Sequence, residues 1–132
     1  LEPNGWKAPS LIGRKFIWGK YDCWSIVTDW FKENKNISIP YWTRPKKFKD
    51  FLKNPEFEYA LPKLNFKKLK TNNDIQVGDV LLFQSITGNL DHVALYLGDN
   101  MILNHNIKSL SCRELFDLRY QQSLRGVYRY AA

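Results

Sequence analysis

The sequence has few of the residues that hold metal ions or build disulfide scaffolds. Its 132 residues contain two cysteines, Cys23 and Cys112, and two histidines, His92 and His105. Two cysteines are too few for a small secreted fold held by several disulfides, and no Cys-x-x-Cys or His-Glu-x-x-His motif supplies the spacing of a zinc site. The sequence therefore predicts no metal centre.

Long apolar runs are also absent. No run approaches the roughly 18 to 20 residues of a membrane span, and residues 1–10 lack the charged-then-apolar order of a signal peptide. We expect a soluble domain without a membrane span. Because the chain begins with Leu1, we also expect that it was trimmed or excised from a longer chain, whose leader or preceding domain this sequence would not contain.

Acidic residues are the minority among the charged side chains. There are 20 Lys and Arg against 13 Asp and Glu, a net charge of +7, and the basic residues are densest over residues 44–70. This balance suits nucleic acid, an anionic cell-wall polymer or a solvated face. Because the sequence has no recognisable nucleic-acid-binding motif, we expect no nucleic-acid partner. With 44% hydrophobic residues, residues 1–132 are long enough for one hydrophobic core and too short for two, which predicts a single domain.

The remaining patterns predict an α+β fold. Asp22 is suited to cap a helix that ends near residues 34–36, and apolar residues recur along it at helical spacing. Residues 41–73 are predicted to be a surface excursion, that is, a segment lying outside the core, with a short helical pattern over 46–53. Alternating apolar segments then predict an antiparallel sheet, over residues 79–86, 92–98, 101–106 and 126–130. The capping-box spacing of Ser111 and Glu114 predicts a helix over 111–121.

Cys23 is the candidate nucleophile. It stands in the first turn of the predicted helix, where unpaired backbone N–H groups and the helix dipole stabilise an anion, so we expect a lowered thiol pKa. The same N–H groups are suited to hold a developing oxyanion. The alternative is that Cys23 is a small apolar residue on the buried side of that helix, a place where free cysteines are often found.

A thiol nucleophile needs a base, and the histidines are the candidates. His92 alternates with the apolar residues of its strand and therefore lies on the other face. The turn after this strand decides which residue orients it. A two-residue loop, Asp99 and Asn100, brings His105 onto the His92 face, whereas a three-residue loop that includes Met101 brings Asn104 there. The sequence leaves both registers open.

Several ordered motifs resemble the NlpC-type cell-wall cysteine peptidases, and within them the branch found in phage tails. The motifs are FIWGKYDCWSIVTDWF, VGDVLLF, DHVALYLGDNMILNHN and SLSCRELF, and the resemblance runs from about residue 16 to residue 130. It implies a papain-like fold in which an N-terminal catalytic helix packs on a small antiparallel sheet. No cofactor is implied.

The resemblance also implies roles for individual residues. Cys23 falls on the nucleophile of the family, His92 on its general base, and Asp22 on the acidic residue before the nucleophile. Asn104 stands twelve positions after the base, where the third polar residue is expected, and His105 remains the alternative. Phe16 occupies a position where relatives often carry Tyr, so oxyanion stabilisation is in question, and Tyr21 is a candidate substitute. Cys112 and Ser111 match no catalytic position and are expected to be structural.

By resemblance, the expected activity is hydrolysis of the peptidoglycan stem peptide between D-glutamate and the following diamino acid. The domain would act at the bacterial cell wall from the tip of a phage tail, with the stem peptide and other tail-tip proteins as partners. One alternative is a structural tail-tip module with weak or absent catalysis. Another is a bacterial cell-wall hydrolase or toxin of the same fold, periplasmic or secreted.

Overall fold

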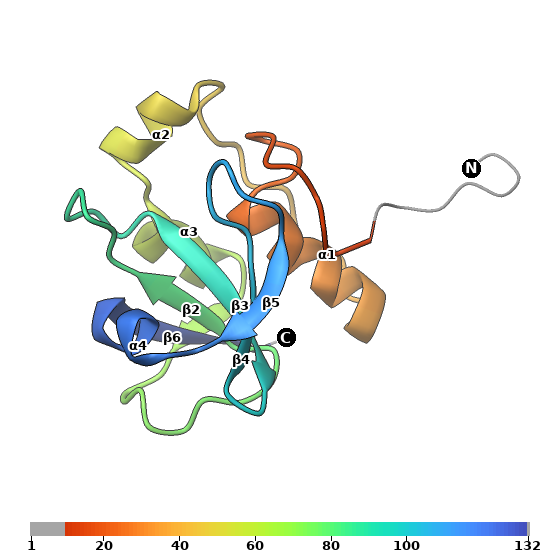
Figure 1. Ribbon diagram of the computed structural model, residues 1–132, viewed down its shortest axis with the longest axis vertical. Coiled ribbons are helices and arrows are strands. Elements are labelled where there is room, and N and C mark those ends of the chain that lie inside the picture. The colour runs from red at the N-terminus through yellow and green to blue at the C-terminus, as the bar shows by residue number, and fades with distance from the viewer. Residues whose placement is uncertain (1–9, 132) are drawn as a thin grey trace, which may run out of the picture.

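The computed structural model describes residues 10–131, which form four helices and a six-stranded antiparallel sheet (Figure 1). The sheet order is β1-β6-β2-β3-β4-β5. The helices are α1 (Cys23–Lys35), α2 (Phe48–Lys53), α3 (Phe57–Lys63) and α4 (Leu118–Ser123). The strands are β1 (Phe66–Lys68), β2 (Val80–Phe83), β3 (His92–Gly98), β4 (Met101–Asn104), β5 (Cys112–Leu115) and β6 (Leu124–Tyr130). The predicted α+β class and papain-like arrangement of helix and sheet are confirmed.

Helix α1 forms as its sequence predicts. The Asp22 carboxylate caps its first turn, and Asn36 ends it in the left-handed conformation. Four side chains at helical spacing are buried on the side that packs against the sheet: Ile26, Val27, Trp30 and Phe31. Their burial stabilises the helix against β3 and β4, and so holds Cys23 at a defined place over the sheet.

The sheet is packed on both faces. Alternate residues of the central strands face α1 in one cluster, which includes Val80, Leu82, Val93, Leu95 and Leu103. The intervening residues form a second cluster with the segment around α4, which includes Leu81, Phe83, Ala94, Ile102 and Tyr120. His92 opens β3 on the same face as Ala94, and its side chain is half-buried. The predicted alternation of β3 is therefore confirmed, and its second face is covered as well.

The predicted helix over residues 111–121 is wrong. Residues 112–115 form edge strand β5, which pairs with β4. Within the predicted range, only the residues from Leu118 onward are helical, as the start of α4. Ser111 caps no helix, because its hydroxyl accepts the Arg14 N–H at 2.8 Å and donates to the Leu11 carbonyl. The cap of α4 is Asp117. Backbone hydrogen bonds to β4 hold residues 112–115 in a strand, although the local sequence favours a helix.

The segment 41–73 is part of the core rather than a surface excursion. The predicted short helix over 46–53 is observed as α2, but the aromatic and aliphatic residues between the lysines turn inward. Phe51, Phe57, Leu61 and Phe66 are each no more than 1% exposed. Their rings and side chains cover the α1 side of the sheet, while the lysines remain at the surface.

Among the helices of residues 10–131, none combines the length and the apolar character that crossing a bilayer requires.

Candidate active site

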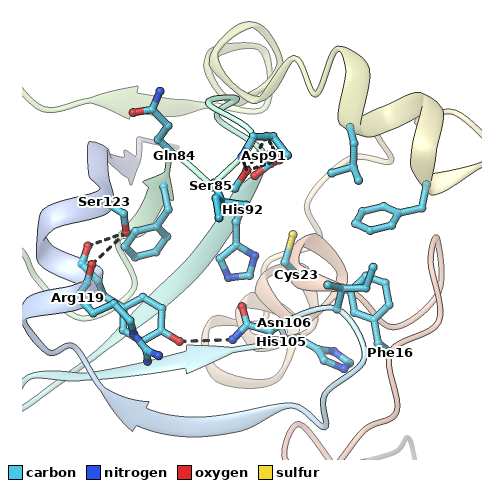
Figure 2. A pocket seen from close by; sticks show the side chains of 17 residues that line it. Phe16, Cys23, Gln84, Ser85, Asp91, His92, His105, Asn106, Arg119 and Ser123 are labelled. Atoms are coloured by element: carbon cyan, nitrogen blue, oxygen red, sulfur yellow. Dashed lines mark hydrogen bonds between the residues drawn. The ribbon is translucent and has the colours of Figure 1, made fainter.

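Cys23 lies at the N-terminal end of α1 and lines a pocket of about 460 Å³ (Figure 2). His92 and His105 line the same pocket, as does Phe16. The backbone N–H of Cys23 has no acceptor among residues 10–131, because Asp22 takes the N–H groups of Trp24 and Ser25 instead. This N–H is therefore available to a ligand that binds at the thiol.

The pKa of Cys23 is raised, contrary to the expectation from its helix position. Burial, and to a smaller extent the neighbouring Asp22 carboxylate, raise the pKa of the Cys23 thiol to about 12. A contact with the Val93 backbone and the Arg44 charge lower this pKa by less. The side chain is only 5% exposed, so desolvation of a thiolate outweighs the helix dipole. The resting thiol is neutral.

The turn between β3 and β4 matches neither complete register that the sequence left open. Its loop has two residues, Asp99 and Asn100, both with positive φ, and Gly98 pairs with Met101. A bulge at Leu97 then shifts the ladder by one residue, so that Leu95 pairs with Leu103. The three-residue loop is therefore wrong.

The bulge nevertheless places Asn104 on the same sheet face as His92. The two side chains meet, with 2.6 Å between His92 Nε2 and Asn104 Oδ1. His105 lies one residue beyond the end of β4, and its side chain contacts Phe16 and the Ser109 carbonyl instead. Of the two candidates for orienting His92, it is Asn104 that contacts the imidazole.

The neighbours of Asn104 determine which way its amide points. Its Nδ2 donates to Glu114 Oε2 at 2.9 Å and to the Tyr120 hydroxyl at 3.0 Å. Both Nδ2 protons are therefore used, and Oδ1 is the atom that faces His92. Since Oδ1 only accepts, His92 Nε2 carries the proton and Nδ1 is the unprotonated nitrogen. The imidazole is thus oriented with a basic nitrogen available in the pocket.

His92 is neutral near pH 7. Burial lowers the pKa of His92 below its ordinary 6.5, while the Asn104 hydrogen bond and the Asp91 and Glu114 charges raise it by less. Figure 2 shows the His92 imidazole and the Cys23 side chain entering one pocket, the first from the sheet and the second from the helix. The resting pair is a neutral thiol and a neutral imidazole, an arrangement suited to proton transfer during attack.

His105 is fully buried and does not reach His92. Its Nε2 donates to the Ser109 carbonyl at 3.2 Å, and its ring packs edge-on against Phe16 with 5.3 Å between ring centroids. Its Nδ1 has no hydrogen-bond partner among the described residues. Burial lowers the pKa of His105, so its ring forms a neutral wall of the pocket.

Asp22 and Tyr21 do not line the pocket. Asp22 is fully buried behind the thiol, where its carboxylate caps α1, accepts the Gly19 N–H and pairs with Arg44 at 3.0 Å. Tyr21 directs its ring at two cations, with 5.0 Å between its centroid and the guanidinium carbon of Arg14. Its hydroxyl is therefore not among the pocket groups that could bind an oxyanion.

Sequence reasoning missed three residues that support this site. Glu114 and Tyr120 hold Asn104, and Arg44 pairs with Asp22. In the sequence, Glu114 and Tyr120 fall in the predicted helix over 111–121 and Arg44 falls in the predicted surface excursion over 41–73. Only their charge or polarity indicated that they could take part in a site. Cys112, expected to be structural, donates its thiol to Glu114 Oε2 at 3.3 Å. Within residues 10–131 no group of three His, Cys, Asp or Glu side chains is arranged to hold a metal ion.

Comparison with known proteins gives two curated relatives from phages. The chain is 30% identical over 126 residues to the tail tip assembly protein K of Escherichia phage lambda, covering 94% of this chain and 61% of that protein. It is 24% identical over 139 aligned residues to the tail tip assembly protein K of Escherichia phage N15, covering 98% of this chain and 52% of that protein. The chain thus spans between half and two-thirds of the length of these relatives.

A solved structure shares the fold. A lipoprotein-like protein of the NLP/P60 family from Staphylococcus aureus superposes with a TM-score of 0.57 at 21% identity, covering 92% of this chain and 38% of that one. The profile of the NlpC/P60 family matches residues 13–129, a range that includes Cys23, His92 and Asn104. This chain belongs to the NlpC/P60 family.

Proposed function

We propose that this domain is a cysteine peptidase that hydrolyses the stem peptide of peptidoglycan, between D-glutamate and the diamino acid that follows it. The NlpC/P60 family consists generally of cysteine peptidases and related hydrolases. The observation that carries the proposal is the contact of the buried Asn104 with His92, whose imidazole lines the same pocket as Cys23. It leaves one nitrogen of a neutral imidazole free to act as a base toward a buried thiol.

The proposed mechanism is acyl transfer through a thioester. His92 Nδ1 takes the proton of the Cys23 thiol as the sulfur attacks the amide carbonyl, and the free N–H of Cys23 donates to the developing oxyanion. The imidazolium then protonates the leaving amine, and a water activated by His92 hydrolyses the thioester. Asn104 keeps the imidazole in the required tautomer throughout. No cofactor takes part.

The proposed place of action is the tip of a phage tail at the bacterial cell wall. It is supported by the two relatives, both of which are named tail tip assembly proteins. Other tail-tip proteins would then be partners, and the net charge of +7 would favour an anionic wall polymer. A bacterial wall hydrolase or toxin of the same fold is the alternative setting for the same chemistry.

A second candidate function is a structural tail-tip module with weak or absent catalysis. It is favoured by two observations: Phe16 lines the pocket at the position where relatives often carry a Tyr hydroxyl, and burial raises the pKa of Cys23 to about 12. The two functions differ in what happens when the thiol is removed. Only the peptidase requires the sulfur of Cys23.

The test is digestion of purified Gram-negative and Gram-positive peptidoglycan, with fragments identified by mass spectrometry. The wild-type domain is expected to release fragments with a new amine on the diamino acid, and Cys23→Ala is expected to release none. Cys112→Ala, which removes the other thiol, serves as the matched control and is expected to retain cleavage. Absence of release from both walls by the folded wild-type domain would favour the structural module.

Glu114→Ala is expected to slow hydrolysis by about tenfold to a hundredfold, because it frees the Asn104 amide to turn its NH₂ group toward His92. The effect should fall on kcat, since Glu114 does not line the pocket. If Glu114 contributed only to stability, its replacement would not change the tautomer of the His92 imidazole. We therefore expect the ¹⁵N signals of the His92 ring to report loss of the Nε2–H tautomer. Glu114→Gln, which keeps an acceptor oxygen, is expected to restore most of the rate, and equal losses in both variants would contradict this role.

A further inference from the structure

Three aspartate side chains are buried in the described chain, and two of them have a cationic partner. Asp22 pairs with Arg44 at 3.0 Å, and Asp79 pairs with Arg129 at 2.8 Å. Asp91 is 7% exposed, and no basic side chain of residues 10–131 lies within ion-pair distance of it. A buried carboxylate without a cation is costly, and such groups in folded proteins are ordinarily paired.

The bonds that Asp91 does make come from hydroxyl groups of the β2–β3 loop. Its Oδ2 accepts from Ser85 Oγ at 2.8 Å and from Thr87 Oγ1 at 3.2 Å. These hydroxyls satisfy lone pairs and hold the carboxylate in place, but they carry no charge. Asp91 is therefore positioned and hydrogen-bonded while its charge remains uncompensated.

Asp91 also differs from the other two aspartates in where it lies. It lines the pocket next to His92, whereas Asp22 and Asp79 do not line it (Figure 2). The Asp91 charge acts on both members of the reactive pair, raising the pKa of Cys23 and of His92. The uncompensated charge thus stands within electrostatic reach of the site of attack.

The other charged groups of the pocket do not offset this carboxylate. Arg119 is the only Lys or Arg among the lining residues, and its guanidinium lies 3.7 Å from Glu114 and 3.9 Å from Asp117. It also stacks on Tyr120, away from Asp91 in Figure 2. The two histidines of the pocket have lowered pKa values and are neutral near pH 7. The pocket therefore presents an anionic group beside His92, although the chain as a whole is basic.

We propose that Asp91 is the anionic part of a substrate subsite that binds a primary ammonium group. No Lys or Arg side chain of the described residues pairs with Asp91, so the substrate ammonium group would be its cationic partner. This pairing offsets the free-energy cost of the buried carboxylate. The identity of the substrate rests on the proposed function. A stem peptide offers an ammonium group from two sources: the amino terminus of a stem already released from its glycan strand, and the side-chain amine of an uncrosslinked diamino acid.

The first test needs no peptidoglycan. Cys23 of the wild-type domain is modified with an ammonium-bearing and a sulfonate-bearing methanethiosulfonate of similar size, and the ratio of the two rates is divided by the ratio for a small free thiol. We expect the wild-type domain to favour the ammonium reagent by at least tenfold. Asp91→Asn keeps the shape and removes the charge, and should lower this preference at least fivefold.

A control separates charge from loop structure. Ser85→Ala removes a hydrogen bond to Asp91 but leaves the carboxylate, so it should keep the preference for the ammonium reagent. Because each preference is a ratio of two rates at one thiol, a change in the thiol pKa cancels from it. An unchanged ratio in Asp91→Asn would overturn the proposal, as would a loss of preference in Ser85→Ala equal to that in Asp91→Asn.

A second test identifies the ammonium group. Calorimetry measures binding of the tripeptide L-Ala-γ-D-Glu-diamino acid to the Cys23→Ala variant, in its free form and with either amine acetylated. We expect acetylation of one amine to weaken binding at least tenfold and Asp91→Asn to remove that difference. Equal binding of all three peptides would overturn the subsite. If no peptide binds while the charge preference at the thiol persists, the peptidoglycan proposal fails and the ammonium subsite stands.

Discussion

His92→Ala is expected to lower kcat/KM for stem-peptide hydrolysis by at least about 10³-fold. With a thiol pKa of about 12, roughly one Cys23 side chain in 10⁵ is ionised at pH 7 without help. His92 is the group placed to remove the proton as attack proceeds, so its loss leaves the reaction dependent on that small thiolate population. Kinetics with a soluble stem-peptide fragment would measure the effect.

The pH dependence follows from the same ionisation states. Burial lowers the pKa of His92, so the neutral, basic form persists below pH 6.5, and the rate should fall only when the pH drops through that lowered pKa. The acid limb of kcat/KM is therefore expected below pH 6.5. In His92→Ala this limb should disappear, and the residual rate should instead rise with each pH unit as the thiol ionises.

A matched control separates chemistry from folding. Asn104→Ala removes the orienting contact but leaves the base, so its loss of rate should be smaller than that of His92→Ala, about tenfold to a hundredfold. Thermal unfolding of each variant checks that the fold is retained. A decrease of less than tenfold in folded His92→Ala would contradict a general-base role.

Arg44→Gln is expected to destabilise the domain by about 3 to 5 kcal/mol. Asp22 is fully buried and Arg44 is 8% exposed, so removing the guanidinium leaves a buried carboxylate without its cation. The guanidinium also stacks on Trp18, with 4.6 Å to the ring centroid, a contact that Gln cannot replace. Urea unfolding would measure the loss as a lower midpoint with an unchanged slope.

The charge explanation for Arg44 can be isolated with a double variant. Asp22→Asn combined with Arg44→Gln removes both charges, and it should be more stable than Arg44→Gln alone. Arg119→Gln is the control for an exposed pair, since the Arg119 side chain is 73% exposed, and it should cost under about 1 kcal/mol. A loss below about 1 kcal/mol in Arg44→Gln would contradict this role. Alkylation of Cys23 should also slow, because the Arg44 charge lowers the pKa of that thiol.

Local sequence patterns were sufficient for the helix that carries the nucleophile and for the central strands. Asp22 and the apolar spacing after it define α1 within one or two residues, and the alternation in β3 puts His92 opposite the α1 face. These features depend on neighbours along the chain, which the sequence displays directly. The candidate nucleophile and base were therefore visible before any tertiary structure.

Two predictions from local sequence patterns failed because contacts with another element of the fold decided the conformation. Residues 112–115 pair with β4 and form a strand, although Ser111 and Glu114 have the spacing of a capping box. The lysine-rich segment 41–73 buries aromatic rings against α1, although its charge suggested a surface excursion. In both cases the conformation is decided by packing or pairing with another element of the fold, which the pattern within the segment does not display.

The choice between Asn104 and His105, and the ionisation of Cys23, required the tertiary structure. A bulge at Leu97 moves the ladder by one residue and so decides which side chain meets His92, and single-sequence patterns carry no signal for such a shift. The thiol pKa depends on how completely the surrounding core excludes water, which outweighs the helix dipole that the sequence does reveal. The sequence thus determined which residues are available for chemistry, whereas strand register and burial, both set by contacts across the fold, decided how they are oriented and charged.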